Sequence, residues 1–80
     1  MQIAIIKHLV ENYTIDELRR AEDALLNEAQ PAIKVEGKDE GEQLTHVLSA
    51  IEIHHDMDSN NIDFRSALRH YTQRVRNSIN

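Results

Sequence analysis

The helix-breaking residues of this chain are confined to one short stretch. Its single proline and both of its glycines lie between Pro31 and Gly41, together with a charged run from Glu36 to Glu40. Outside that stretch no residue must interrupt a helix, and a single phenylalanine disfavours a strand-rich domain. We therefore predict an all-α fold, a small antiparallel bundle of three to four helices that forms one domain over residues 1–80.

Apolar side chains at helical spacing predict where the helices lie. The predicted helices span about residues 3–12, 15–30, 40–58 and 63–78, with a linker at 31–39. A short strand over Ile3–Ile6 is the alternative for the first segment, although it lacks the alternation of a half-buried strand. The second helix begins at a capping box formed by Thr14 and Glu17. We expect Pro31 to end it, because a proline disfavours helical geometry in the residue before it.

The third predicted helix carries the widest apolar stripe. Its expected core face consists of Leu44, Val47, Leu48, Ile51 and either His54 or His55, widened by Ala50, Ile53 and Met57. The last helix is expected to bury Phe64, Ala67, Leu68, Tyr71, Val75 and Ile79. The width of the stripe on the third helix suggests that this helix is buried on more than one side. Because a short chain without cysteine has little stability to spare, we expect a homodimer.

Composition restricts the chemistry and the location of the protein. The chain contains no cysteine, which excludes disulfides, thiolate zinc sites and thiol redox reactions. No apolar run approaches the roughly 18–20 residues of a membrane span, and no secretory signal is recognisable. We therefore expect a cytoplasmic protein without a membrane partner.

The charge is distributed unevenly along the chain. The net charge is −5, but residues 1–62 carry −8 and residues 63–80 carry +3. An acidic protein is not attracted to nucleic acid as a whole. The basic last helix nevertheless offers an interaction surface, with Arg65, Arg69, Arg74 and Arg76 as candidate residues, and a nucleic-acid accessory role is one alternative function. The simpler interpretation is that these arginines favour the helix end and pair with the acidic body.

One motif could bind a metal. Glu52 and His55 form a Glu-x-x-His pair, whose i, i+3 spacing places a carboxylate and an imidazole on one helical face, as in di-iron and di-manganese bundles. One motif per chain means that a dimer would have to supply the second, with Glu22 or Glu28 as a further ligand. Glu42 and His46 form a second candidate pair. The simpler interpretation is that such spacings arise by chance in a chain with 14 acidic residues and 5 histidines.

Both ends of the chain resemble a known family. The segments Ile5–Val10 and Gln73–Asn80, with Leu48–Ile53 between them, are similar to an uncharacterised family of small all-helical bacterial proteins of about this length. The resemblance implies no activity and no functional residue.

No catalytic group is evident from the sequence. The serines lack a nucleophile elbow, and no phosphate loop or dinucleotide fingerprint is present. We therefore expect a protein that is not an enzyme and has no cofactor. The expected function is that of an accessory or protein-interaction module of the bacterial cytoplasm, with a protein partner still to be identified.

Overall fold

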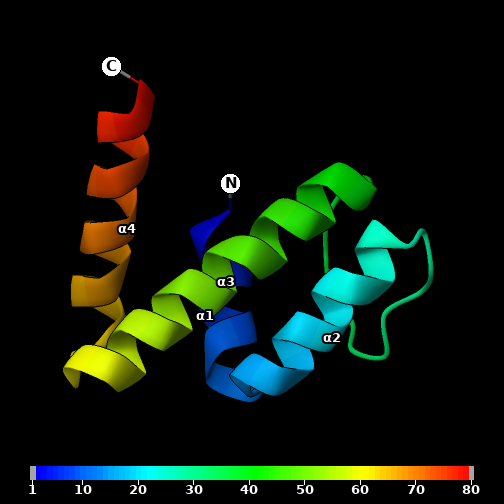
Figure 1. Cartoon of the computed structure of the whole chain (residues 1–80), viewed down its shortest axis with the longest axis horizontal. Coiled ribbons are helices and arrows are strands. Elements are labelled where there is room, and N and C mark those ends of the chain that lie inside the picture. The colour runs from blue at the N-terminus through cyan, green and yellow to red at the C-terminus, as the bar shows by residue number, and fades with distance from the viewer. Residues whose placement is uncertain (1, 80) are drawn as a thin grey trace.

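The computed structural model of the chain consists of four helices. It describes residues 2–79, with only the backbone of Ile79, so the expected burial of the Ile79 side chain lies outside the described residues. The helices are α1 (Ile3–Asn12), α2 (Ile15–Leu26), α3 (Glu40–Asn60) and α4 (Phe64–Ile79) (Figure 1). No strand occurs between residues 2 and 79. The predicted all-α fold is confirmed, and the strand alternative for the first segment is wrong.

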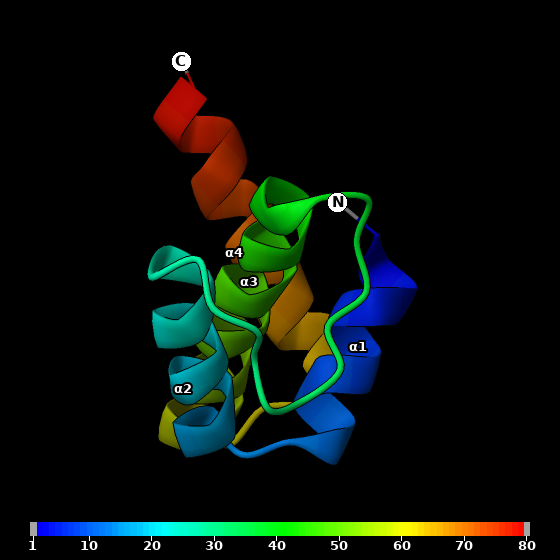
Figure 2. The same cartoon turned by 90° about the vertical axis from the view of Figure 1, so that its right-hand side faces the viewer.

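Helix α3 is the centre of the fold, and each of the other helices packs against it. Helix α2 runs alongside α3 in the opposite direction, while α4 turns back from the end of α3 and rises from the body (Figures 1 and 2). The core is formed by residues from every helix and from the linker: Ile6, Leu9, Val10, Leu18, Ala21, Leu25, Val35, Val47, Ala50, Ile53 and Ala67. Among the described side chains of α4, only Ala67 belongs to this buried set, so this part of α4 is less embedded than the other helices.

The two ends of α2 show how local residues define a helix. At its start, the Glu17 N–H donates to Thr14 Oγ1 at 3.1 Å, and the Thr14 N–H donates to Glu17 Oε1 at 3.0 Å, which confirms the capping box. Its end differs from the prediction, because α2 stops at Leu26 rather than at about residue 30. Glu28 adopts the left-handed conformation, with a φ of 57°. The N–H of Ala29 then bonds to the carbonyl of Ala24, which is the Schellman arrangement.

The linker is longer than predicted and packs closely on the body. Val35 is buried and Ile33 contacts the core, so the alternating apolar residues cover the bundle as expected. A Cβ at Gly37 would lie 2.8 Å from Gln43 Cγ, so only glycine permits this approach to α3. The linker ends at Asp39, whose carboxylate accepts from the Glu42 N–H at 2.8 Å and caps α3.

The buried face of α3 differs from the predicted apolar stripe. Leu48, expected in the core, is 41% exposed, and Leu44 and Ile51 are only half-buried. The fully buried positions instead include three polar residues, His46, Ser49 and Asp56. The stripe prediction is wrong at Leu48, because it ranked positions by apolarity and not by which arc of α3 the other helices cover. It is confirmed at Val47, Ala50 and Ile53, which are buried, and Leu44, Ile51 and Met57 pack against the core. An apolar strip of α3 is therefore left facing solvent.

None of the helices between residues 2 and 79 combines the length and the apolar character that crossing a membrane requires.

Candidate functional site

The outward side of α3 forms the floor of a groove between α2 and α4. Two adjoining hollows of about 620 and 430 Å³ share Arg19, Ile51 and Glu52, so they form one continuous surface. We call this surface the α3 groove. It is lined by Arg19, Glu22 and Asp23 from α2, by Leu48, Ile51, Glu52, His55, Asp56, Ser59 and Asn60 from α3, and by Tyr71 and Arg74 from α4.

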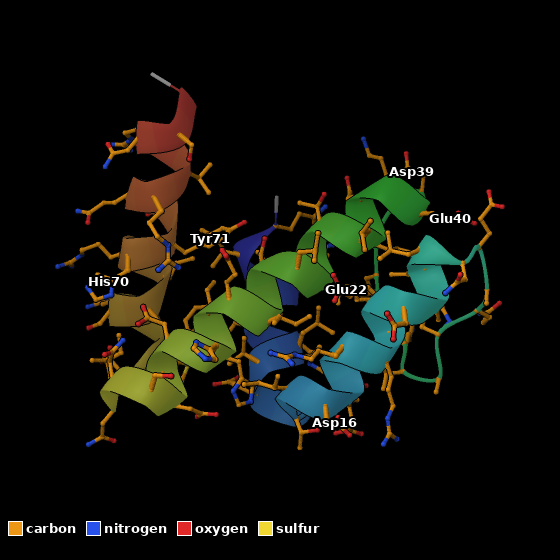
Figure 3. The ribbon with its side chains drawn as sticks, in the orientation of Figure 1. Asp16, Glu22, Asp39, Glu40, His70 and Tyr71 are labelled. Atoms are coloured by element: carbon orange, nitrogen blue, oxygen red, sulfur yellow. The ribbon has the colours of Figure 1, made fainter. Side chains whose placement is uncertain are left out.

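One end of the α3 groove is apolar. Leu48 is 41% exposed there, beside the half-buried side chains of Ile51 and Tyr71. Figure 3 shows Tyr71 on the side of α4 that faces α3, and Glu22 on the side of α2 that borders α3. The Tyr71 hydroxyl is held by a 2.8 Å hydrogen bond to Ser49 Oγ, which leaves its ring as part of the groove wall. An apolar centre surrounded by charged groups is typical of protein-binding surfaces.

The charged groups of the α3 groove are predominantly acidic. Four carboxylates, those of Glu22, Asp23, Glu52 and Asp56, accompany two guanidinium groups, those of Arg19 and Arg74. Arg74 lies 4.0 Å from Glu52, and both side chains are more than half exposed, so this pair is weak. With four carboxylates against two guanidinium groups, the residues that line the groove carry an excess of negative charge, which attracts positively charged groups.

The other end of the groove contains a carboxylate that ties α4 to α3. Asp56 is 7% exposed and accepts hydrogen bonds from the Asn60 amide and from His70 Nδ1, the latter at 2.9 Å. The bond from His70, followed by the bond from Asn60, holds the pKa of Asp56 below its usual value, although burial acts in the opposite direction. The Asp63 pKa is also lowered, mainly by the bond from the Ser66 N–H at the start of α4. Both shifts lead away from the near-neutral pKa that a general base needs.

The predicted metal ligands are only partly brought together. Glu52, His55 and Glu22 all line the α3 groove, whereas Glu28 lies in a separate hollow beside the linker. Over the range 2–79, no three His, Asp or Glu side chains are grouped closely enough to hold a metal ion. A site shared between two copies stays a prediction.

The second candidate pair has a structural role instead. His46 is fully buried, receives a hydrogen bond from the Gln2 N–H on Nε2 at 3.3 Å, and bonds to the Glu36 carbonyl through Nδ1 at 2.9 Å. Glu42 accepts a bond from the Lys38 N–H at 3.1 Å. We therefore correct the second metal hypothesis: both ring nitrogens of His46 are already occupied, and this residue joins α1, the linker and α3.

The four arginines of α4 fall on two sides of the helix, because helical spacing places Arg65, Arg69 and Arg76 on one side and Arg74 on the opposite one. Arg74 lines the groove, whereas Arg65 lies near Asp63 and helps to lower its pKa. Arg69 and Arg76 are exposed and belong to neither of the two hollows of the groove. A nucleic-acid role for these arginines stays a prediction.

Sequence reasoning missed two features of this site. It interpreted Asp56 as a solvated charge near a helix end, whereas Asp56 is buried, although the spacing of Asp56 and Asn60 at i, i+4 is a local signal for a side-chain hydrogen bond. It also placed Leu48 in the core, whereas Leu48 is exposed in the groove; Tyr71 packs against the core as predicted and lines the groove as well. No sequence signal distinguishes an apolar residue that faces its own chain from one that faces a partner.

Comparison with known proteins adds a family but no function. The model of a family of unknown function (DUF6952) matches residues 1–80. No curated protein and no solved structure matches the chain.

Proposed function

We propose that this chain, which belongs to the family of unknown function DUF6952 over its whole length, is a non-enzymatic protein-interaction module. Its binding site is the α3 groove, and its ligand is a basic amphipathic helix. The observation that carries the proposal is Leu48, which is 41% exposed on the floor of a groove with an acidic rim. A helix with an apolar stripe and flanking Lys or Arg side chains matches this combination.

The dimensions of the site support this class of ligand over a small molecule. The groove is an open surface bordered by three helices, and its two hollows join along α3. Small-molecule sites enclose most of their ligand, whereas a helix laid in a groove keeps one side in solvent. The absence of cysteine fits a reducing compartment, so we place the module in the cytoplasm.

Photo-crosslinking in the cells that produce the chain tests the proposal. A benzophenone amino acid replaces Leu48 in the groove, and in a matched control it replaces Leu26, which is 61% exposed on α2 but does not line the groove. We expect irradiation to produce a discrete protein adduct from position 48 and none from position 26. If position 48 yields no adduct, or if both positions yield the same adducts, the groove is not a protein-binding site.

A further inference from the structure

We infer that the helix bound in the α3 groove is the second half of α4 from a second copy of this chain, exchanged reciprocally in a two-fold dimer. The inference rests on the proposed function, because it names the partner of the same groove. It is argued from the placement of α4, from charge, and from the symmetry that the groove permits.

The second half of α4 lacks a packing surface in its own chain. Ala67 is fully buried against the body, but every residue from Gln73 to Ser78 is exposed. Figures 1 and 2 show this part of α4 rising away from the other helices. Val75, at 40% exposure, continues the apolar side of α4 beyond the body. A helix end of this length is marginally stable in water unless its apolar face is covered.

The charge of α4 is complementary to that of the groove. The inserted segment, Gln73–Ser78, has two charged residues, Arg74 and Arg76, and no carboxylate, whereas the groove has four carboxylates and two arginines, one of which is its own chain's Arg74. The inserted segment is therefore a basic helix end with one exposed apolar residue, Val75, which suits an acidic groove with an apolar residue on its floor. Opposite potentials on the two surfaces promote association and disfavour other orientations.

The position of the groove permits the exchange to be symmetric. Tyr71 and Arg74 of α4 form one wall of the groove, so the donating helix and the accepting site adjoin one another. In a two-fold dimer each copy contributes the same surface. An axis near Gln73, with the two α4 helices antiparallel, sets Val75 of each copy against Tyr71 and Leu48 of the other. Each copy then covers the exposed leucine and the exposed valine of its neighbour.

A pair of complementary variants tests this arrangement. Leu48→Asp places a charge on the groove floor, and Val75→Lys places the opposite charge on the inserted helix. In sedimentation equilibrium, we expect a wild-type dimer at micromolar concentration and a dissociation constant at least about tenfold higher for each variant alone. The control Leu26→Asp, outside the groove, leaves the dissociation constant unchanged. Circular dichroism confirms that each variant is folded, and exposed positions such as these tolerate substitution.

Mixing the two variants is the decisive measurement. A mixed dimer contains one intact Leu48–Val75 contact and one Asp–Lys pair, so we expect its dissociation constant to recover to within about threefold of the wild-type value. A monomeric wild-type protein would overturn the inference, and so would a dimer that neither variant weakens or a mixture that does not recover. If Leu48→Asp does not fold, Val75→Lys alone and the adduct from position 48 decide the question.

The adduct from position 48 separates failure of this inference from failure of the proposed function. An adduct of twice the 9.2 kDa chain mass supports the exchanged dimer. An adduct of any other mass contradicts the inference and leaves the groove as a binding site for a different protein. The absence of an adduct contradicts both.

Discussion

At the scale of single residues, Asp56 is the polar group that most constrains the structure. A carboxylate this well buried is stable only if its oxygens receive hydrogen bonds, and Asn60 and His70 supply one to each oxygen. Asn60 belongs to the same helix, whereas His70 belongs to α4. The carboxylate therefore specifies the position of α4 on α3, in addition to the apolar contact of Ala67.

The pH dependence of stability tests this role. Because the pKa of Asp56 is lowered in the folded state, its ionised form stabilises the fold above the ordinary value of 3.8, and this contribution is lost as the pH falls through the lowered pKa. We expect Asp56→Asn to have a lower Tm than wild type near neutral pH. The difference in Tm between wild type and Asp56→Asn should become smaller in strong acid, where Asp56 is protonated.

Thermal melts followed by circular dichroism across this pH range provide the measurement. Asp58→Asn is the matched control, because Asp58 is on the same helix and also pairs with a histidine, His54, at 3.2 Å, but is 63% exposed, where such a pair contributes little. Equal pH profiles for wild type and Asp56→Asn would show that the buried carboxylate does not contribute in this way.

At the scale of helices, local side chains cap the starts of α2, α3 and α4. The capping box of Thr14 and Glu17, and the cap of Asp39 on the Glu42 N–H, involve residues three apart in the sequence. Such bonds satisfy backbone N–H groups that have no partner within the helix. They require no contact with the rest of the fold, so they can be predicted from sequence.

Removing the cap of α2 should destabilise the protein moderately. We expect Thr14→Ala to lower the free energy of unfolding by about 1 kcal/mol, because the Glu17 N–H loses its acceptor. Thr14→Ser keeps the hydroxyl oxygen and should cost much less. Urea unfolding of the three proteins gives the comparison, and equal midpoints for Thr14→Ala and wild type would contradict the prediction.

At the scale of the whole molecule, the chain has a packed body and a projecting helix. Its radius of gyration is 12.2 Å, slightly above the roughly 11.6 Å expected for a compact chain of this length. The core lies where α1 and α2 cover α3, and α4 adds to it chiefly through its first half. Stability should therefore depend far more on the centre of α3 than on the exposed apolar residues.

A comparison of two truncations tests this division. Ile53 is fully buried, and we expect Ile53→Ala to lower the free energy of unfolding by about 2–5 kcal/mol, a large part of the stability of a small domain. Leu26 is 61% exposed, and Leu26→Ala should change the free energy of unfolding by less than about 0.5 kcal/mol. Urea unfolding measures both values, and similar losses for the two variants would contradict the proposed core.

The end of α2 could not be predicted from the sequence, because it depends on contacts that the following linker makes with the body. Pro31 was expected to end the helix, but the chain leaves the helix at Glu28, which takes a left-handed conformation that favours glycine or asparagine. The linker that follows buries Val35 and carries Gly37 against Gln43. The chain must leave α2 early to make these contacts, and nothing in the sequence near Glu28 indicates them.

The sequence by itself determined the fold class, a range of three to four helices and most of the helix starts, because caps, helix-breaking residues and apolar spacing act within a few residues. Tertiary structure alone decided which side of α3 is buried. His46 and Asp56 lie inside because Gln2, Glu36 and His70, distant in sequence, supply their hydrogen bonds. Leu48 lies outside because no element of its own chain fully covers it. Whether a side chain of α3 is buried depends on which other segments pack over it, and those segments are distant in sequence and meet only in the folded chain.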